Sequence, residues 1–345
     1  MLKPDSRKTA SGGVSPVANG VSPVERLHAL VTADMAATDR MIHARMGSGV
    51  ALIPDLARHL IDSGGKRLRP MLTLAAAQMG GYGGDKHINL AAAVEFIHTA
   101  TLLHDDVVDA STLRRGKVAA NLVWGNKATV LVGDFLFSRA FQLMVETHSL
   151  RVLDILAGAS AIIAEGEVMQ LKSQSNLAIT EEHYLKVVGA KTAALFAAAA
   201  ESGATLCDKG PAFIEAMRAY GESLGIAFQL VDDALDYSGR QALMGKAVGD
   251  DFREAKVTLP VILAYARADK QADVFWKRVI ETSSQTEADL ERAISYVEST
   301  GAIQETMTRA RHYADNAVAA LSPLPQGEIR SALADIADFC VERAY

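Results

Sequence analysis

Two runs of aspartates are the features of this sequence best suited to chemistry. Residues 102–109 read Leu-Leu-His-Asp-Asp-Val-Val-Asp, and residues 229–236 read Gln-Leu-Val-Asp-Asp-Ala-Leu-Asp. Because positions four residues apart share one face of a helix, the first and last aspartates of each run project side by side. Like charges this close raise one another's pKa, a cost that a divalent cation relieves. Magnesium binds one or two carboxylates and completes its shell with water and phosphate oxygens.

A solvated helix end would explain one such run, but both runs lie in strongly apolar segments. Uncompensated charge in such a setting costs several kcal/mol per ion. We therefore predict that the two runs hold metal ions and, through them, a diphosphate. The predicted metal ligands are Asp105, Asp106, Asp109, Asp232, Asp233 and Asp236.

A diphosphate also requires fixed positive groups, and the sequence supplies them in compact runs. Residues 64–70 read Gly-Gly-Lys-Arg-Leu-Arg-Pro, in which glycines let the backbone approach a ligand and three cations follow. A solvated, charged loop is the alternative for this run. Arg114 and Arg115 follow the first aspartates closely, and a guanidinium group can bind phosphate through two parallel hydrogen bonds.

Other basic residues stand in less obvious places. Lys191 interrupts an apolar helix, where a buried ammonium group needs an anionic partner, although a lysine that reaches the surface fits the same pattern. Residues 245–260 mix glycines with charges and suit a mobile loop that closes over phosphate. His98 lies two helical turns before Asp105 on nearly the same face, a position that a core histidine would also occupy.

Composition excludes several classes of protein. The 345 residues include 35 Lys plus Arg against 41 Asp plus Glu, a net charge of −6 that argues against a nucleic-acid binder. Two distant cysteines, Cys207 and Cys340, exclude a disulfide scaffold or a zinc module. We find no uninterrupted apolar stretch of membrane-spanning length and no secretory signal. We expect a soluble, cytoplasmic protein.

The elements that must position these residues are helices. Residues 1–21 are rich in Ser, Gly and Pro and are expected to form a disordered tail, whereas 22–345 is expected to form a single all-α domain. Ser22-Pro23-Val24-Glu25 predicts a capping box at the first helix. No strand-turn-strand signature is present. Apolar spacing predicts helices at about 23–46, 50–62, 69–79, 86–109, 127–147, 150–174, 181–203, 211–238, 258–268, 272–282, 286–299, 301–321 and 327–343.

From Gly64 to beyond Pro260, the order and spacing of these runs resemble the trans-type polyprenyl diphosphate synthases, the family of farnesyl, geranylgeranyl and longer-chain prenyl synthases. The resemblance implies an isoprenoid-synthase-type helical bundle around a deep central cavity, normally a homodimer. It implies two substrates, isopentenyl diphosphate and an allylic diphosphate such as farnesyl diphosphate, and three Mg²⁺ ions per active site.

The resemblance also implies a role for each matching residue. Residues expected to take part in catalysis are Asp105, Asp109, Arg114, Lys191, Asp232 and Lys246. The allylic diphosphate would contact Arg114, Lys191, Thr192, Gln229, Lys246 and Lys256, and isopentenyl diphosphate would contact Lys66, Arg69, His98 and Arg115. One departure is Ala255, where long-chain members commonly have glycine; alanine lacks glycine's freedom at positive φ.

The implied reaction ionises the allylic diphosphate, and the double bond of isopentenyl diphosphate attacks the resulting carbocation. The growing tail needs an apolar tunnel, and one isoprenoid unit is about as long as one helical turn, about 5.4 Å. In short-chain relatives, aromatic residues four or five positions before the first aspartate close the tunnel. Here these positions hold Thr101 and Ala100, with Ile97 one turn further.

The small residues predict a long-chain synthase with a C40–C50 product, decaprenyl favoured, that serves quinone side-chain biosynthesis. Transient membrane contact could accompany release of such a product. Candidates for the tunnel floor are Phe135, Phe137, Phe141 and Met144, although core packing would explain this set equally well.

Other functions fit the sequence less well. A shorter-chain farnesyl or geranylgeranyl synthase and a non-catalytic subunit of a heteromeric prenyl synthase are the alternatives. A class I terpene cyclase usually lacks both the second aspartate run and the Gly-Gly-Lys run, and a lipid-binding or scaffold role leaves the paired aspartate runs unexplained.

Overall fold

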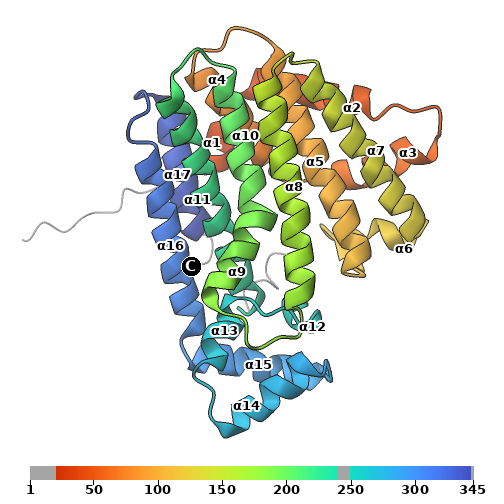
Figure 1. Ribbon diagram of the computed structural model, residues 1–345, viewed down its shortest axis with the longest axis vertical. Coiled ribbons are helices and arrows are strands. Elements are labelled where there is room, and N and C mark those ends of the chain that lie inside the picture. Colours follow the sequence, from red (N-terminus) through yellow and green to blue (C-terminus); the bar gives the residue numbers. More distant parts are fainter. Residues whose placement is uncertain (1–20, 239–248, 343–345) are drawn as a thin grey trace, which may run out of the picture.

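The computed structural model describes residues 21–238 and 249–342 (Figure 1). The predicted tail at 1–21, except for its last residue, lies outside the described residues. The predicted site residue Lys246 also lies outside them. The helices before the first aspartates are α1 (Pro23–Leu30), α2 (Thr32–Arg45), α3 (Leu52–Ile61), α4 (Leu68–Met79) and α5 (Lys86–Val108). A short hairpin of β1 (Leu113–Arg114) and β2 (Lys117–Val118) follows, then α6 (Ala120–Trp124), α7 (Asn126–Val145) and α8 (Leu150–Ser173).

The second half of the chain continues with helices. They are α9 (Glu181–Val188), the π-helix η2 (Gly189–Ala193), α10 (Ala194–Thr205), α11 (Pro211–Asp236), α12 (Asp250–Arg253) and α13 (Leu259–Tyr265). The last are α14 (Lys270–Trp276), the π-helix η4 (Lys277–Glu281), α15 (Glu287–Ser299), α16 (Ala302–Ala320) and α17 (Glu328–Glu342). The all-α prediction is confirmed.

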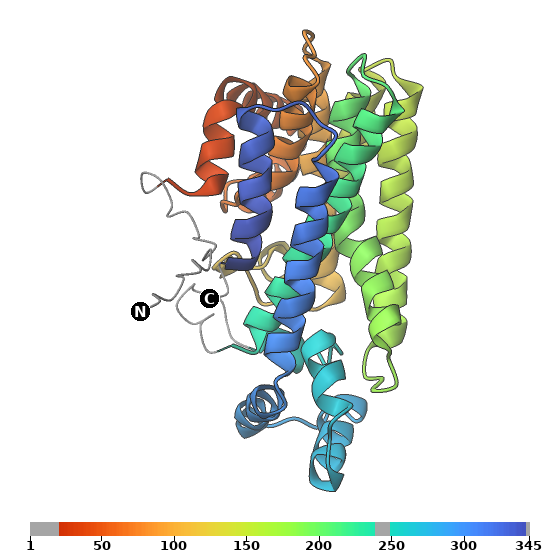
Figure 2. The same ribbon diagram turned by 90° about the vertical axis from the view of Figure 1, so that its left-hand side faces the viewer.

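The long helices form one bundle in which distant segments are neighbours. Helix α5 packs along α7, α10 packs against α4, α8 and α11, and α16 packs against α11 and α17. Figures 1 and 2 show these helices side by side, with α14 and α15 below the lower end of the bundle. The aspartate-bearing ends of α5 and α11 both lie in the lower part of the bundle (Figure 1).

Local sequence signals explain the main helix boundaries. The Ser22 side chain accepts a hydrogen bond from the Glu25 backbone N–H, and the Glu25 carboxylate accepts one from the Ser22 N–H, so the predicted capping box is confirmed. The predicted helix at 23–46 is interrupted at Val31, which caps α1. The predicted helix at 181–203 contains η2, an irregularity that apolar spacing does not reveal. The hairpin and the short helices α6 and α12 were not predicted, because elements this short leave little periodicity.

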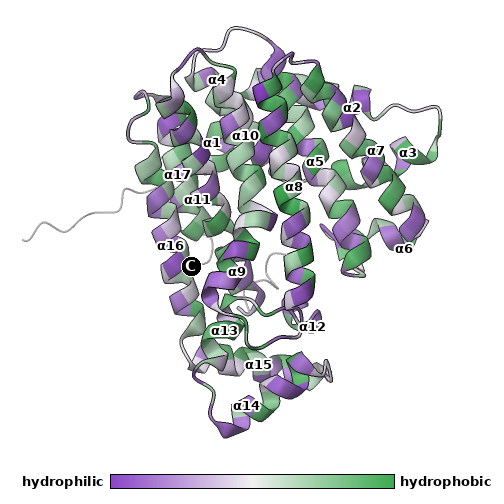
Figure 3. Cartoon of the chain, viewed as in Figure 1, coloured by the Kyte–Doolittle hydropathy of each residue, from purple (hydrophilic) through white to green (hydrophobic). Residues whose placement is uncertain are grey.

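Most buried residues are apolar and form clusters between the long helices. Figure 3 shows hydrophobic residues along each of these helices. Helix α5 is buried over most of its circumference, as its composition predicts. Helix α7 is apolar and long enough to cross a membrane by length and composition, but the core helix of a bundle passes the same test. Here α7 packs along α5.

Candidate active site

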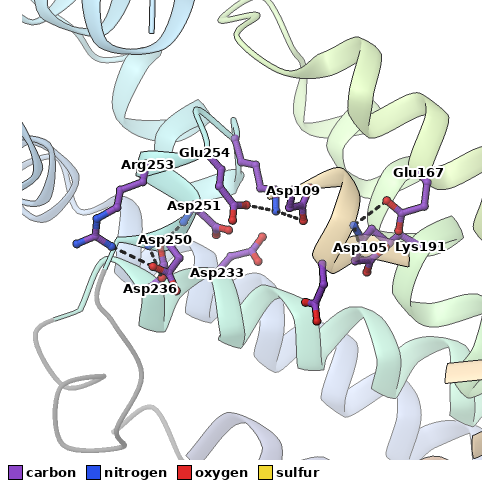
Figure 4. A network of polar contacts seen from close by, with 12 residues as sticks. Asp105, Asp109, Glu167, Lys191, Asp233, Asp236, Asp250, Asp251, Arg253 and Glu254 are labelled. Carbon is purple, nitrogen blue, oxygen red and sulfur yellow. Dashed lines mark hydrogen bonds and ion pairs between the residues drawn. The ribbon is translucent and has the colours of Figure 1, made fainter. Parts of the chain in front are cut away.

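The two aspartate runs face a common region of the bundle. Asp105 lies in the last turn of α5 and Asp109 caps that helix, while Asp233 and Asp236 lie in the last turn of α11. Figure 4 shows the carboxylates of these two helix ends on opposite sides of one polar network. The sequence prediction that both runs serve one site therefore agrees with the fold.

Asp105 belongs to a charged group that also contains a lysine from η2. The Lys191 Nζ lies 2.8 Å from the Glu167 Oε2 and 3.9 Å from the Asp105 Oδ2 (Figure 4). Burial raises the pKa of Asp105 to about 7; Lys191 opposes this shift, and Glu167 and Asp109 add to it. The alternative of a Lys191 that reaches bulk solvent is thus wrong, since its ammonium group pairs with carboxylates inside the site.

The π-helix explains how Lys191 reaches this position. A π-turn inserts an extra residue and turns the side chains that it carries relative to the rest of the helix, and such turns are frequent at functional sites. Gly166 on α8 allows the close approach: a Cβ atom there would lie 2.8 Å from the Lys191 backbone nitrogen and 2.9 Å from the Ala190 Cβ. The backbone of η2 therefore packs directly against α8.

Asp106 differs from its two neighbours. Its carboxylate is fully buried, its Oδ1 accepts a hydrogen bond from the Arg114 Nε at 2.7 Å, and its backbone oxygen accepts one from the Asn121 Nδ2 at 2.9 Å. Burial raises the pKa of Asp106 above its usual value, although Arg114 opposes part of this shift. Asp106 thus anchors the segment after α5, and its predicted role as a metal ligand has no support from this geometry.

The second run is held by neighbours from three segments. Asp233 is buried and accepts hydrogen bonds from the Tyr184 hydroxyl and, at 2.7 Å, from the Gln229 Nε2. The Asp236 carboxylate accepts the backbone N–H groups of Asp250 and Asp251 at 3.2 and 3.0 Å, so it caps α12. Asp232 is the most exposed of the three aspartates of this run.

Burial dominates the electrostatics of the second run. It raises the pKa of Asp233 to about 7 despite hydrogen bonds from Tyr184 and Gln229, and the pKa of Asp236 to about 6 despite the backbone N–H groups. Asp251, which spacing did not single out, lies half-buried beside them, and loss of solvation together with Asp233 and Asp236 raises its pKa well above the usual range. Clustered carboxylates that resist ionisation favour binding of a divalent cation, because the cation offsets their mutual repulsion.

The segment after α12 closes the polar network. The Lys256 Nζ lies 3.0 Å from the Asp109 Oδ2 and also pairs with Glu254 (Figure 4). Burial lowers the pKa of Lys256, but Asp109, Asp251 and Glu254 outweigh this and raise it overall. Ala255 adopts φ 51°, the left-handed conformation that glycine favours, so the departure noted in the sequence falls at a strained position.

A second cationic group surrounds His98. The Arg69 Nη1 lies 3.3 Å from the His98 Nε2, the Arg69 guanidinium stacks over the Phe196 ring at 4.2 Å, and Arg115 donates a hydrogen bond to the Gly64 carbonyl. Burial, reinforced by Arg69 and Arg115, lowers the pKa of His98 well below its usual value, so the imidazole is neutral. Burial lowers the pKa of Arg69 to about 10, which leaves it charged at neutral pH.

Lys66 lies just before α4, with its Nζ 5.4 Å from the centre of the Phe339 ring on α17. The structure thus brings together Arg69, His98 and Arg115, three of the four residues expected to bind one diphosphate, while the fourth, Lys66, faces Phe339. Spacing did not single out Glu95, a buried carboxylate whose Oε1 lies 3.4 Å from the Arg67 Nη1 and which offsets part of this positive charge.

The described residues contain no ready-made cage of three or more metal-ligating side chains. The donor set nevertheless suits magnesium, because it consists of carboxylate oxygens and because Mg²⁺ needs only one or two of them beside water and phosphate oxygens. Asp105, Asp109 and Asp232 would hold such ions, with Asp233 and Asp236 behind them. Bound there, the metal would stabilise negative charge on a departing diphosphate.

Small residues continue from the first aspartates into the apolar core. Ala100, Ile97 and Ala93 are fully buried on α5, and Thr101 is half-buried. Among the predicted floor residues, Met144 is fully buried in the same apolar cluster, which also contains Leu136, Val152 and Leu156.

Two of the other floor candidates, Phe135 and Phe137, are only partly buried against that cluster, and Phe141 is 36% exposed. Phe141 lies outside that cluster in the single chain, so this packing does not support it as the floor residue. Met144 is the floor candidate that the fold supports.

Comparisons with known proteins agree with this site. Residues 50–297 match the family model described as polyprenyl synthetase. The octaprenyl diphosphate synthase of Escherichia coli K12 is 43% identical over 320 residues, which cover 93% of this chain and 99% of that protein.

Two solved structures are more similar in sequence. A polyprenyl synthase from Caulobacter crescentus, solved with calcium and isoprenyl diphosphate, is 56% identical with a TM-score of 0.91 over 93% of this chain and 98% of that one. A decaprenyl diphosphate synthase from Rhodobacter capsulatus is 54% identical with a TM-score of 0.90 over 94% of this chain and 100% of that one.

The fold and the site define an all-α prenyltransferase that handles diphosphate substrates. The chain belongs to the polyprenyl synthetase family, and the resemblance noted in the sequence is confirmed. Within that family, its similarity to octaprenyl and decaprenyl synthases places it with the long-chain trans-polyprenyl diphosphate synthases.

Proposed function

We propose that this enzyme makes a C40–C50 prenyl diphosphate, with decaprenyl diphosphate favoured, by magnesium-dependent head-to-tail addition of isopentenyl diphosphate to an allylic primer such as farnesyl diphosphate. The observation that carries the proposal is the arrangement of two aspartate runs above a core lined by small residues. The two similar relatives that make octaprenyl and decaprenyl diphosphate bracket this length. A role in quinone side-chain biosynthesis would use such a product.

Each charged group has a task in this proposal. Lys191, Arg114 and Lys256, with Thr192 and Gln229, would hold the allylic diphosphate beside the aspartates. The two aspartate runs would hold three Mg²⁺ ions, which would neutralise charge on that diphosphate. The structure of the Caulobacter synthase is a complex with calcium and isoprenyl diphosphate. The isopentenyl diphosphate would bind Lys66 and the second cationic group, formed by Arg69, His98 and Arg115.

The separation of the two groups fits a condensation of two diphosphates. The His98 group and the Lys191 group lie about two turns apart along nearly the same face of α5, so the two diphosphates can bind next to one another. Neutral His98 can donate one hydrogen bond to phosphate without adding charge. The buried surroundings would exclude water, which would otherwise capture the carbocation as an alcohol.

The test is incubation of the purified chain with farnesyl diphosphate, isopentenyl diphosphate and Mg²⁺, followed by chromatographic sizing of the dephosphorylated product. A C40–C50 product that requires Mg²⁺ supports the proposal. A C15 or C20 product would instead favour the shorter-chain alternative, and no product from the chain alone would favour a subunit of a heteromeric synthase.

We also propose a homodimer built on the side of the bundle formed by α7 and α8. These adjacent helices carry large apolar side chains that are 45–83% exposed, namely Leu131, Val145, Leu150, Ile162, Val168 and Leu171. Isolated apolar residues are normal at a surface, but a set on two neighbouring helices is typical of an interface. Light scattering should give twice the chain mass, and Leu131→Arg should shift it towards one chain mass.

The proposed location is the cytoplasm, with no nucleic-acid partner and at most transient membrane contact during product release. Fractionation of cells that express the tagged chain tests this location. Recovery in the membrane pellet after a high-salt wash would contradict it.

A further inference from the structure

Tyr184 is a buried residue on α9 that is not among the predicted site residues. Only 5% of its surface is exposed, and its hydroxyl donates a hydrogen bond to the Oδ2 of Asp233. A buried tyrosine hydroxyl needs a hydrogen-bond partner, and the partner of Tyr184 is the middle aspartate of the second run. The contact therefore links α9 to the end of α11.

The same carboxylate continues a chain of hydrogen bonds into η2. The Asp233 Oδ1 accepts from the Gln229 Nε2 at 2.7 Å, and the Gln229 Oε1 accepts from the Thr192 Oγ1 at 2.9 Å. Thr192 follows Lys191, which pairs with Glu167 near Asp105. Four buried or half-buried groups thus connect α9, α11 and η2 in one continuous network.

The network fixes the geometry of the second run. Both Asp233 oxygens are bonded, so the carboxylate has one preferred orientation, and its neighbour Asp232 faces the more open side. A pocket lined by Tyr184, Lys191, Gln229, Asp233 and Lys256 adjoins this network. A shift of the Asp233 side chain would therefore move groups on the metal side and on the diphosphate side together.

We propose that Tyr184 is a positioning residue that orients Asp233 and, through it, the second aspartate run for binding of divalent metal and diphosphate. Its hydroxyl contacts neither substrate nor metal in this role. The inference rests on the proposed magnesium-dependent function. Hydrogen-bonding partners behind metal-binding groups typically contribute about 10- to 100-fold in metal affinity.

The test compares Tyr184→Phe with Tyr220→Phe. The first variant removes only the hydroxyl that bonds Asp233. The second is a matched control. Tyr220 is also buried, lies on α11 and donates one hydrogen bond to the Leu333 carbonyl at 2.8 Å, which the substitution removes. Tyr220 bonds α17 instead of the aspartates, so the control reproduces the structural loss alone.

The readout is thermal stabilisation by Mg²⁺ titrated in the presence of inorganic diphosphate, which needs no turnover. Tyr184→Phe should raise the Mg²⁺ midpoint about tenfold, whereas Tyr220→Phe should leave it unchanged. In steady-state assays, kcat of Tyr184→Phe should fall about tenfold with little change in KM for isopentenyl diphosphate.

Equal Mg²⁺ midpoints for the two variants, whether shifted or not, would overturn the inference. Failure of the proposed function has a different signature, because the wild-type chain would then show no Mg²⁺-dependent condensation at all. The two failures are therefore distinguishable within one set of experiments.

Discussion

The length of the product should depend on the position along α5 at which a bulky side chain blocks the tunnel. Ala100 and Ala93 are fully buried on this helix and belong to the same apolar cluster. They lie seven residues apart, which is about two turns and therefore nearly the same face. Replacing either alanine with phenylalanine should place a ring across the path of the growing tail.

The expected lengths come from helix geometry. At about 1.5 Å per residue, Ala100 lies about 7.5 Å and Ala93 about 18 Å from Asp105 along the helix axis. Ala100→Phe should therefore stop growth near C15 to C20. Because the difference of about 10.5 Å equals about two turns, Ala93→Phe should give a product about two isoprenoid units longer than Ala100→Phe.

Stability sets the limit of this experiment. Both alanines are fully buried, so the larger ring should cost about 1–3 kcal/mol in free energy of unfolding where it presses on its neighbours. Circular dichroism melts will show whether both variants remain folded, and chromatography of the dephosphorylated products gives the lengths. Equal product lengths from two folded variants would refute the idea that α5 measures the chain.

Three further outcomes follow from the charged groups. Asp105→Ala or Asp232→Ala should lower turnover by about a hundredfold or more while the helical circular dichroism spectrum persists; activity near the wild-type value would exclude a role for that residue in binding metal. Because burial raises the pKa of Asp105 and Asp236 to about 7 and 6, above the unfolded value, their contribution to stability is present at low pH and is lost as pH rises through these values. The melting temperature of metal-free protein should therefore fall between about pH 4 and 7, Asp105→Asn should reduce the fall, and a flat wild-type profile would contradict the assignment. Arg69→Lys should raise KM for isopentenyl diphosphate about tenfold, because lysine lacks the planar guanidinium that stacks on Phe196, while KM for the allylic substrate changes little; equal changes in both constants would contradict separate subsites.

The fold could be predicted well because most of its signals are local. The capping box at Ser22, the proline at the start of α11 and the apolar spacing of the long helices each depend on residues close in sequence. The predicted helix boundaries were wrong where contacts between distant segments determine them. The break at Val31 lies in a run with good helical spacing, and η2 depends on the packing of Gly166 against Lys191, which is remote in sequence.

Residue spacing predicts which site residues share a helix face, but it does not predict the partners that other elements supply. Four-residue spacing predicts that Asp105 and Asp109 share a face, yet they have different partners, Lys191 from η2 and Lys256 from the segment after α12. Spacing also treats the middle aspartates as equal to their neighbours. The fold separates them, because the helix turns Asp106 towards Arg114 and Asp233 towards Tyr184.

The backbone shows why these partners escape a sequence pattern. Four non-glycine residues with positive φ, Arg67, Ala110, Arg115 and Ala255, each lie within two residues of a predicted site residue. An alanine or arginine in this conformation costs about 1–2 kcal/mol, so surrounding contacts must enforce it. For Ala255 these contacts include the Lys256 pair with Asp109, which spans the distance from the last α12 turn to the end of α5. The Lys256–Asp109 pair joins residues 147 positions apart, and residue spacing within one helix contains no information about such long-range pairing.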